Sequence, residues 1–402
     1  DKREKMHLRL VKGAYWDYEI KHAQFFGYED YPVYSKKSLT DISFLLCAKE
    51  ILKNEKIYAK FATHNAHTIS SVHQLGQGKD YEFQRLYGMG ELLYQSAEKV
   101  LNLEKKPSVY APIGSYKDLL PYLVRRLLEN GANSSFINRL LDPETDANWL
   151  AENPAIRIEK EKIDIPLPKN IFTERKNSSG FDLSENSNLK NLEKSISAHK
   201  KNKINAESIY VNRDEKEKVG QKVYSIANNE EIGTAIFDDP TNVKSALENF
   251  ASEKWSKYSV QERSQILIKI SDDIEKDPSE LIFYLLNEAG KTIQNAIDEI
   301  REAIDFLRYY SRQIIEIHGK KSLQGPTGEI NNISYSPKGN YLCISPWNFP
   351  VAILIGQISA ALACGNNVVV KPSENTSILG YLIVKKFHAV SYTHLTLPTT
   401  IE

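Results

Sequence analysis

Two adjacent arginines on a predicted helix are strong candidates for ligand binding in this sequence. Apolar residues recur at helical spacing along 119–130, which predicts a helix with one apolar stripe. Tyr122, Arg125, Arg126 and Glu129 fall at i, i+3, i+4 and i+7, so they share the opposite face. Two neighbouring guanidinium groups suit a carboxylate or a phosphate, which they bind through forked hydrogen bonds. A solvated face on which the arginines pair with Glu129 is the alternative.

Polar or glycine-rich segments follow four predicted strands in the first 140 residues. Strand-like runs at 7–11, 57–63, 81–86 and 108–111 alternate with helix-like runs at 17–26, 37–53, 66–74, 89–101 and 116–130. This alternation is typical of parallel βαβ units, whose ligands bind where the strands end. The segments KGAYW, THN, YG and PIG follow the four strands, so we expect them to meet at one edge. The architecture is half of a (β/α)8 barrel or an open doubly wound sheet, and Lys12 and His64 could equally be simple loop caps.

A second group of candidates lies between residues 341 and 376, where a βαβ pattern spans 339–345, 352–363 and 367–371. Asn348 stands between Trp347 and Phe349 just past the first strand, where its amide could donate to a developing oxyanion. Lys371 and Glu374 follow the next strand and could hydrogen-bond a ribose. The structural alternatives are a turn asparagine and a Lys-Pro-Ser-Glu segment that only starts a helix.

Composition predicts a soluble globular protein. The 402 residues suggest two or three domains, and 52 basic residues balance 52 acidic ones. Zero net charge without a basic block gives no indication of nucleic-acid binding. The longest apolar run, 351–364, contains Gln357 and Ser359 and is shorter than the roughly 20 residues that span a bilayer. Three scattered cysteines do not suggest a disulfide framework or a metal site, so we expect a reducing, cytoplasmic compartment.

The middle of the chain is predicted to be a connection between domains. Four prolines between residues 143 and 168 and a polar stretch at 176–188 suggest an extended segment over about 141–202. A β-like patch at 222–226 and a helix-rich run at 242–317 follow, with one helix opening at Val260 and another centred on 281–286.

Several motifs together resemble a known family. RLVKGAYWDYEIKHAQ, FATHNAHT, YEFQRLYGMGELLY and YAPIGSYKDLLPYLVRRLLENGANSSFINR closely resemble the proline dehydrogenase domain of bifunctional proline utilization A flavoenzymes. That domain is a (β/α)8 barrel that binds FAD, and residues 7–140 resemble its last four units. The resemblance implies that Arg125 and Arg126 clamp the proline carboxylate, while Tyr110, Tyr122 and Leu86 line the substrate pocket. It also implies a catalytic Arg9 near the reactive flavin edge and FAD contacts from Arg9, Lys12, Gly13, Ala14, Trp16, Thr63, His64 and Asn65.

The strings YLCISPWNFPVAILIGQISAALACGNNVVVKPSENT and NEAGKTIQNAIDEIREAIDFLRYYSRQ resemble the NAD-binding domain of aldehyde dehydrogenases. The match is specifically to the glutamate semialdehyde dehydrogenase half of the same family, over about residues 190–388. It implies that Asn348 is the catalytic oxyanion-hole side chain and that Lys371 and Glu374 contact the adenosine ribose. It further implies NAD contacts along Ile344, Ser345, Pro346 and Trp347.

The resemblance implies a parent enzyme that oxidises L-proline to pyrroline-5-carboxylate with FAD, then glutamate semialdehyde to L-glutamate with NAD. Quinone would accept the electrons from FAD, which implies peripheral contact with the inner face of the membrane. We expect domains at 1–140 and 190–388, a linker at 141–189 and a non-native tail at 389–402. A chain that starts at Asp1 and resembles only four barrel units is expected to be a fragment truncated at both ends and inactive by itself.

The family's cysteine nucleophile and glutamate base are not recognisable in this chain. Cys47, Cys343 and Cys364 are each interpreted as small hydrophobic residues, and no metal ligands are predicted. The alternatives to a fragment of the bifunctional enzyme are a catalytically incompetent truncated or chimeric product and a Rossmann-like protein that only binds ligands.

Overall fold

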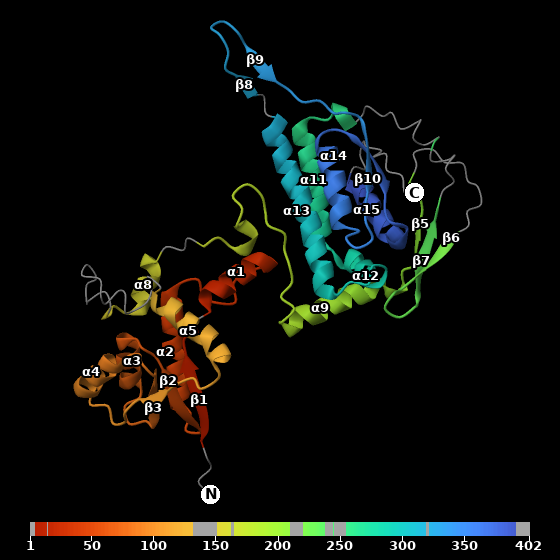
Figure 1. The fold of residues 1–402 in the computed structure, drawn as a ribbon. Helices are drawn as coiled ribbons and strands as arrows, with labels where there is room; N and C mark the ends of the chain where they lie inside the picture. Colours follow the sequence, from red (N-terminus) through yellow and green to blue (C-terminus); the bar gives the residue numbers. More distant parts are fainter. Residues whose placement is uncertain are drawn as a thin grey trace. The chain divides into compact units, whose positions relative to one another are not determined.

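The computed structural model describes residues 5–13, 15–131, 151–161, 165–209, 220–237, 244, 255–318 and 321–390, without the side chains of 127–131 and 321. The chain divides into two compact units, which Figure 1 shows as ribbons. Unit 1 comprises residues 1–21 and 31–165, and unit 2 comprises residues 22–30 and 166–402. The division falls within helix α1 (Trp16–Phe26).

Unit 1 is built on a parallel sheet of four strands in the order β1-β2-β3-β4. The strands are β1 (Met6–Val11), β2 (Ile57–Ala62), β3 (Tyr81–Leu86) and β4 (Ser108–Tyr110). Its helices are α2 (Lys37–Lys53), α3 (Ala66–Leu75), α4 (Glu91–Leu101), α5 (Tyr116–Gly131) and α8 (Pro154–Lys160). The predicted alternation of strands and helices is confirmed. In the part of the chain that the structure describes, β1 and β4 are edges of the sheet, and closure into a barrel stays a prediction.

The two faces of this sheet differ in chemistry because successive side chains of a strand point to opposite faces. Ala59, Phe61 and Phe83 are buried on the helix side, in one cluster with residues of α2, α3 and α4. The intervening positions, such as Lys60 and Glu82, carry polar side chains that bond to one another. The sheet therefore has an apolar face toward its helices and a polar face on the other side.

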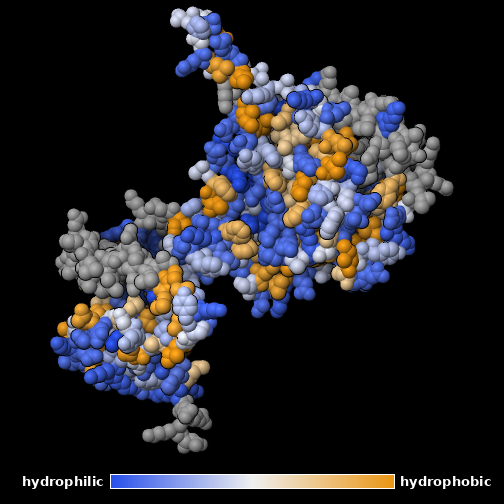
Figure 2. Space-filling view, viewed as in Figure 1, coloured by the Kyte–Doolittle hydropathy of each residue, from blue (hydrophilic) through white to orange (hydrophobic). Residues whose placement is uncertain are grey.

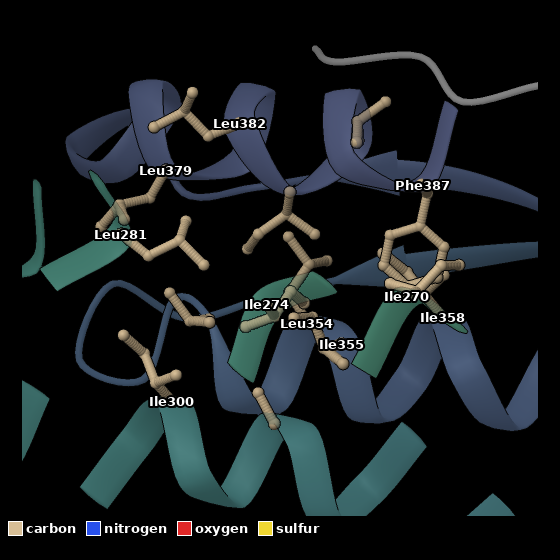
Figure 3. Close-up of a cluster of buried hydrophobic side chains, with 14 of the residues drawn as sticks. Ile270, Ile274, Leu281, Ile300, Leu354, Ile355, Ile358, Leu379, Leu382 and Phe387 are labelled. Carbon is tan, nitrogen blue, oxygen red and sulfur yellow. The ribbon is translucent and has the colours of Figure 1, made fainter. Parts of the chain in front are cut away.

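The core of unit 2 is a set of helices packed with a parallel strand pair. The helices are α11 (Val260–Lys276), α12 (Ser279–Asn287), α13 (Ile293–His318), α14 (Ala352–Ala363) and α15 (Ser377–Val390). The strands are β10 (Asn340–Ile344) and β11 (Asn367–Lys371), which confirms the predicted βαβ pattern. The long helix α13 lies beside α11 and α14 (Figure 1). Figure 3 shows apolar side chains from α11, α12, α13, α14 and α15 converging, among them Ile270, Ile274, Leu281, Ile300, Leu354, Ile355, Ile358, Leu379, Leu382 and Phe387.

Smaller elements complete unit 2. A sheet of order β5-β7-β6 is formed by β5 (Ile204–Ala206), β6 (Gly220–Tyr224) and β7 (Glu231–Ile236), and β8 (Lys321–Leu323) pairs with β9 (Asn331–Ile333) as a hairpin. The remaining helix is α9 (Asn186–Ser197), and short 3-10 turns occur at η1 (Pro168–Asn170), η2 (Ala198–Lys201), η3 (Trp255–Lys257) and η4 (Glu374–Thr376).

The predicted extended connection over 141–202 is wrong where the structure describes the helices α8 and α9 within it. Helix α9 occupies 186–197 and buries Leu192 and Ile196, an i, i+4 pair that is easily overlooked among many polar residues. Ahead of it, the Ser178 hydroxyl donates a 2.9 Å hydrogen bond to Asp305 of α13. Arg308 of α13, only 4% exposed, is bound by carboxylates of α11 and lies against the carbonyl of Asn177. This stretch is therefore packed onto unit 2.

The predicted apolar stripe of α5 is exposed in unit 1. Leu120, Leu123 and Val124 are 44%, 53% and 46% exposed. Figure 2 shows apolar patches among hydrophilic residues on the visible face of this unit as well. Within the described residues, the apolar stripe is therefore not buried in the core of this unit.

Helix α15 begins on the buried side chain of a glutamate. Glu288, 3% exposed, accepts hydrogen bonds from the backbone N–H groups of Ile378 (2.8 Å) and Leu379 (2.9 Å). An acidic side chain at a helix N-terminus satisfies amides that have no partner within the helix. Burial nevertheless raises the pKa of Glu288 to about 8, against the effect of these two donors.

The raised pKa of Glu288 predicts a pH-dependent stability of unit 2. The folded-state pKa exceeds the unfolded value of about 4.3, so this contribution is fully present below about pH 4 and lost as the pH rises through about 8. We expect the free energy of unfolding, measured by urea titration, to decrease from pH 5 to pH 8.5, and to decrease less in Glu288→Gln. Glu280→Gln in α12, the helix that ends just before Glu288, is the control, and Glu280 lies 3.8 Å from Lys386. Parallel pH curves for wild type and Glu288→Gln would contradict the prediction.

Candidate functional site

The polar face of unit 1 brings Arg9 and Tyr110 together. Arg9 on β1 donates from Nε to Gln84 Oε1 at 2.8 Å, and its guanidinium carbon lies 4.8 Å from the centre of the Tyr110 ring. The family resemblance implied roles for Arg9 and Tyr110, whereas Gln84 was not predicted. The available signal was the two-residue period of β3, because Gln84 stands two positions before the predicted pocket residue Leu86.

Helix α5 brings the arginine pair to the loops that follow the strands. Arg125 donates a hydrogen bond to the Tyr15 hydroxyl, and its guanidinium lies 4.8 Å from that ring centre. Arg126 lies 5.2 Å from the ring centre of Tyr122. Tyr15 belongs to the KGAYW segment that was expected to reach this edge, but no role of its own was predicted for it. The stacked geometry suits planar guanidinium groups, for which lysine is no substitute.

His64 connects the ends of β2 and β3. The Leu86 backbone N–H donates to His64 Nε2 at 3.1 Å, so this nitrogen accepts and carries no proton. Burial, together with the charges of Arg126 and Arg85, lowers the pKa of His64. The neutral ring is therefore bound to Leu86 and lies near Arg126, so three predicted site residues lie in one place.

Other predicted flavin-contacting residues have partners within the protein. Lys12 Nζ lies 2.5 Å from Asp41 and 3.0 Å from Thr68 Oγ1, in a largely buried ion pair with α2. Asn65 caps α3 by accepting from the Thr68 N–H at 2.9 Å, and Trp16 donates to the Tyr34 carbonyl at 3.0 Å. FAD contacts from these side chains stay predictions.

Three further positions complete the predicted flavin set. Thr63 Oγ1 accepts from the Asn65 N–H at 3.2 Å. A side chain at Gly13 would meet no atom within 4 Å, which leaves its backbone open to a ligand. Ala14 lies outside the described residues. The donor set at this edge, Arg9, Arg125 and Arg126 beside a neutral His64, fits an anionic or electron-rich group such as a carboxylate or a reduced flavin.

In unit 2, the carboxyl ends of β10 and β11 place a second set of predicted residues side by side. Ile344 pairs with Lys371, and the Ser345 N–H donates to the Lys371 carbonyl at 3.2 Å. Ser345 is 4% exposed, and its Oγ has no hydrogen-bond partner among the described residues. A buried hydroxyl without a partner is costly unless a ligand satisfies it, so this edge fits a polar cofactor.

The remaining predicted residues of this second site flank that edge. Pro346, Trp347 and Asn348 follow β10 in a bend, where Trp347 is 60% exposed and Asn348 is exposed. Glu374 starts the turn η4 after β11 and is also exposed. The structure thus brings Ile344, Ser345 and Lys371 into contact, while the NAD roles of the whole set stay predictions.

A buried ion pair anchors the segment that carries Asn348. Glu299 of α13, 1% exposed, accepts from the backbone N–H groups of Val351 (2.8 Å) and Ala352 (3.2 Å) at the start of α14. Its other oxygen lies 2.6 Å from Lys291 Nζ, which lies 4.1 Å from the ring centre of Phe349. Sequence reasoning missed this pair, although a glutamate within the apolar stripe of α13 was a usable signal.

The cysteines differ from the prediction in part. Cys343 is 4% exposed, and burial raises its pKa to about 11, which agrees with a packing role. Cys47 and Cys364 are exposed, so the structure does not give them the packing role that their interpretation as small hydrophobic residues suggested. Cys364 is the C-cap of α14, where the helix emerges from the core, and helix periodicity alone does not show where a helix reaches the surface.

Comparisons with known proteins support two domains in this order. A proline dehydrogenase family model matches residues 1–139, and an aldehyde dehydrogenase family model matches residues 210–398. The bifunctional protein PutA of Salmonella typhimurium is 40% identical over 398 residues, covering 94% of this chain and 29% of that protein. A crystal structure of PutA from Bradyrhizobium japonicum has a TM-score of 0.84 at 36% identity, covering 99% of this chain and 38% of that one. The 1-pyrroline-5-carboxylate dehydrogenase 1 of Halalkalibacterium halodurans is 38% identical over 143 residues, covering 36% of this chain and 27% of that protein.

The chain therefore combines a proline dehydrogenase domain with an aldehyde dehydrogenase domain that follows it, in a mixed α/β fold. Its sequence and fold match part of the bifunctional PutA proteins over nearly the whole of this chain, as the sequence motifs predicted. The chain spans 29% of the length of the PutA protein of Salmonella typhimurium. Among the helices that the structure describes, none is both long and apolar enough to cross a membrane.

The close approach of Gly90 to His64 generates a testable prediction. Gly90 has a φ of +69°, and an added Cβ would lie 2.8 Å from His64 Cδ2. Gly88, in the same turn with a φ of +76°, has open space around the added Cβ. Each alanine substitution places a chiral residue in the left-handed backbone region, which costs about 1–2 kcal/mol. Only the added Cβ of Gly90→Ala also collides with His64.

We expect Gly90→Ala to lower the free energy of unfolding of unit 1 by about 1–3 kcal/mol more than Gly88→Ala does, as measured by urea titration. The displaced His64 ring should also be less buried. The pKa of His64, measured by NMR titration, should therefore rise toward its ordinary value in Gly90→Ala only. Equal behaviour of the two variants would show that the contact has no role in holding His64.

Proposed function

We propose that unit 1 contributes proline and FAD binding to the oxidation of L-proline to pyrroline-5-carboxylate. The observation that carries the proposal is the meeting of Arg125 and Arg126 with the loops after β1 and β2. The comparisons support it, since the relatives are named bifunctional PutA proteins and a proline dehydrogenase model matches this region.

In this proposal the two guanidinium groups hold the substrate carboxylate through paired hydrogen bonds. Tyr110, Tyr122 and Leu86 form walls around the pyrrolidine ring, which orient the carbon next to its nitrogen. FAD, when bound, supplies the acceptor for the hydride that leaves this carbon. Arg9 would face the negative charge that develops. The proposed flavin contacts are those of Arg9, Lys12, Gly13, Ala14, Trp16, Thr63, His64 and Asn65.

Unit 2 is proposed to bind NAD for the oxidation of glutamate semialdehyde to L-glutamate. NAD, when bound, supplies the hydride acceptor. Lys371 and Glu374 are proposed to hydrogen-bond the adenosine ribose, and the Ser345 hydroxyl, which lacks a partner among the described residues, offers a further polar contact. Asn348 would donate its amide to the developing oxyanion.

For the whole protein we also propose quinone as the electron acceptor, peripheral contact with the inner face of the membrane and a cytoplasmic location. A binding role without turnover is the second candidate for this chain. It is favoured by the position of β1 at an edge of the sheet within the described residues, where Met6 (66%) and Val11 (45%) are exposed. Proline-dependent reduction of a dye by the purified chain separates the two candidates.

The proposed carboxylate clamp predicts a loss of proline affinity. In the 402-residue chain mixed with FAD, we expect Arg125→Met or Arg126→Met to weaken L-proline binding roughly ten- to hundredfold by calorimetry, because hydrogen bonds to a charged group are lost. Lys117→Met, an exposed position on the same helix, should leave the affinity unchanged. Equal L-proline affinity of Arg126→Met and Lys117→Met would contradict the proposed carboxylate clamp. Loss of flavin absorbance after gel filtration would contradict FAD binding by this chain.

The proposed NAD site predicts that one end of the β10–β11 pair binds nucleotide. We expect Lys371→Ala to weaken NADH binding by roughly tenfold, because a charged hydrogen-bond donor is lost from the carboxyl end of β11. Lys338→Ala, at the exposed opposite end just before β10, is the matched control and should bind as wild type does. Enhancement of NADH fluorescence measures both, and identical titrations of the two variants would contradict the assignment.

A further inference from the structure

Arg9 is anchored through a single nitrogen. Its Nε donates to Gln84 Oε1 at 2.8 Å, and its guanidinium lies 4.8 Å from the Tyr110 ring centre. Its two terminal nitrogens make no hydrogen bond to any residue in the described part of the chain. A guanidinium held in this way keeps four N–H donors for a ligand while its plane is fixed from behind.

The amide of Gln84 can serve Arg9 in one orientation only. Gln84 Nε2 donates to Glu82 Oε1 at 2.9 Å, so its oxygen faces Arg9 and its nitrogen faces a carboxylate. The flipped amide would set a donor against the Arg9 N–H and an acceptor against the carboxylate of Glu82. Both contacts would be repulsive, so Glu82 selects the amide orientation that Arg9 requires.

Glu82 is itself held on the same face of the sheet. Lys60 Nζ lies 3.3 Å from its Oε1, and the Tyr58 hydroxyl donates to its Oε2 at 3.2 Å. Although burial alone would raise it, the hydrogen bonds from Gln84, Lys60 and Tyr58 lower the pKa of Glu82. The carboxylate is therefore charged at neutral pH and acts as a constant acceptor for the amide.

Strand register explains how β1 reaches β3 across β2. Arg9 is aligned with Lys60, and Gln84 is aligned with Ala62, so all four positions share one face. Ala62 is the smallest side chain that a chiral residue offers, which leaves room for Arg9 and Gln84 to meet above it. Lys60 and Glu82 pair one step further from the carboxyl edge.

We propose that Gln84 is a positioning residue for Arg9 and that Glu82, through Gln84, sets the direction of the Arg9 guanidinium toward the ligand. We call the hydrogen-bonded series Glu82–Gln84–Arg9 the arginine relay. For the identity of the ligand the proposal rests on the proposed proline dehydrogenase function, in which Arg9 meets the negative charge that develops on the flavin. The relay itself depends only on the protein.

The test uses the 402-residue chain with labelled arginine and follows the Arg9 Nε–Hε group by NMR. We expect Gln84→Leu to increase the hydrogen-exchange rate of this group by roughly tenfold or more, the factor that a hydrogen bond to a charged group contributes. Gln84→Glu retains an acceptor oxygen and should keep the group protected. Gln77→Leu, at an exposed position after α3, is the matched control and should leave the rate unchanged.

A second variant guards against loss of the fold. Glu82→Gln keeps the shape of the side chain but can both donate and accept hydrogen bonds, so it no longer selects one orientation of the Gln84 amide. The exchange rate of the Arg9 Nε–Hε group should therefore rise, while the circular dichroism spectrum stays that of wild type. An exchange rate within twofold of wild type in both Gln84→Leu and Glu82→Gln would overturn the relay.

Titration with FAD separates the relay from the proposed function. If wild type binds FAD, Gln84→Leu should weaken binding several-fold, whereas Gln77→Leu should not. If wild type fails to bind FAD while Gln84→Leu still increases the exchange rate of the Arg9 Nε–Hε group, the proposed function of the chain is wrong and the relay stands. If FAD binds and all variants exchange alike, the relay is wrong and the proposed function stands.

Discussion

The alternation of side chains along parallel strands is the constraint on which the candidate site of unit 1 depends. Each strand must give one face to the helices, and Phe61 and Phe83 meet that requirement in the core. The positions between them are consequently free to be polar, and register aligns those of neighbouring strands. Arg9, Gln84 and Tyr110 meet because the apolar positions fix which way every other residue points.

In unit 2, two buried glutamates bind the backbone N–H groups at the starts of helices. A helix that starts inside a protein exposes N–H groups that no turn can satisfy, and Glu288 and Glu299 each supply acceptors for two of them. The isolated charge of Glu288 is strongly disfavoured by burial, whereas Lys291 partners Glu299 at 2.6 Å. These two contacts fix the starts of α15 and α14, and therefore the segments after β11 and β10 that carry the predicted NAD residues.

Sequence reasoning performed well where a local pattern was sufficient and failed where partners were distant. The strands of unit 1 and the βαβ segment at 340–371 followed from periodicity and turn residues, and the residues at their ends followed from topology. Gln84 and Glu299 were missed because their partners lie 75 and about 52 positions away in sequence, and no local pattern records such a pairing. Helix α9 was missed because two apolar residues among many polar ones give a weak signal, although they suffice to bury one side.

The residues selected from sequence divide into those used within the protein and those left for a ligand. Lys12 is occupied by Asp41 and Asn65 by the start of α3, so their chemistry first serves the fold. Arg9 keeps its terminal nitrogens and Ser345 keeps its hydroxyl without a partner among the described residues, at the carboxyl edges of two different sheets. A polar group that the protein holds in place without satisfying it gains most from a ligand, because the cost of ordering it has already been met. By this criterion, Arg9 and Ser345 should contribute more binding free energy than Lys12 and Asn65 do.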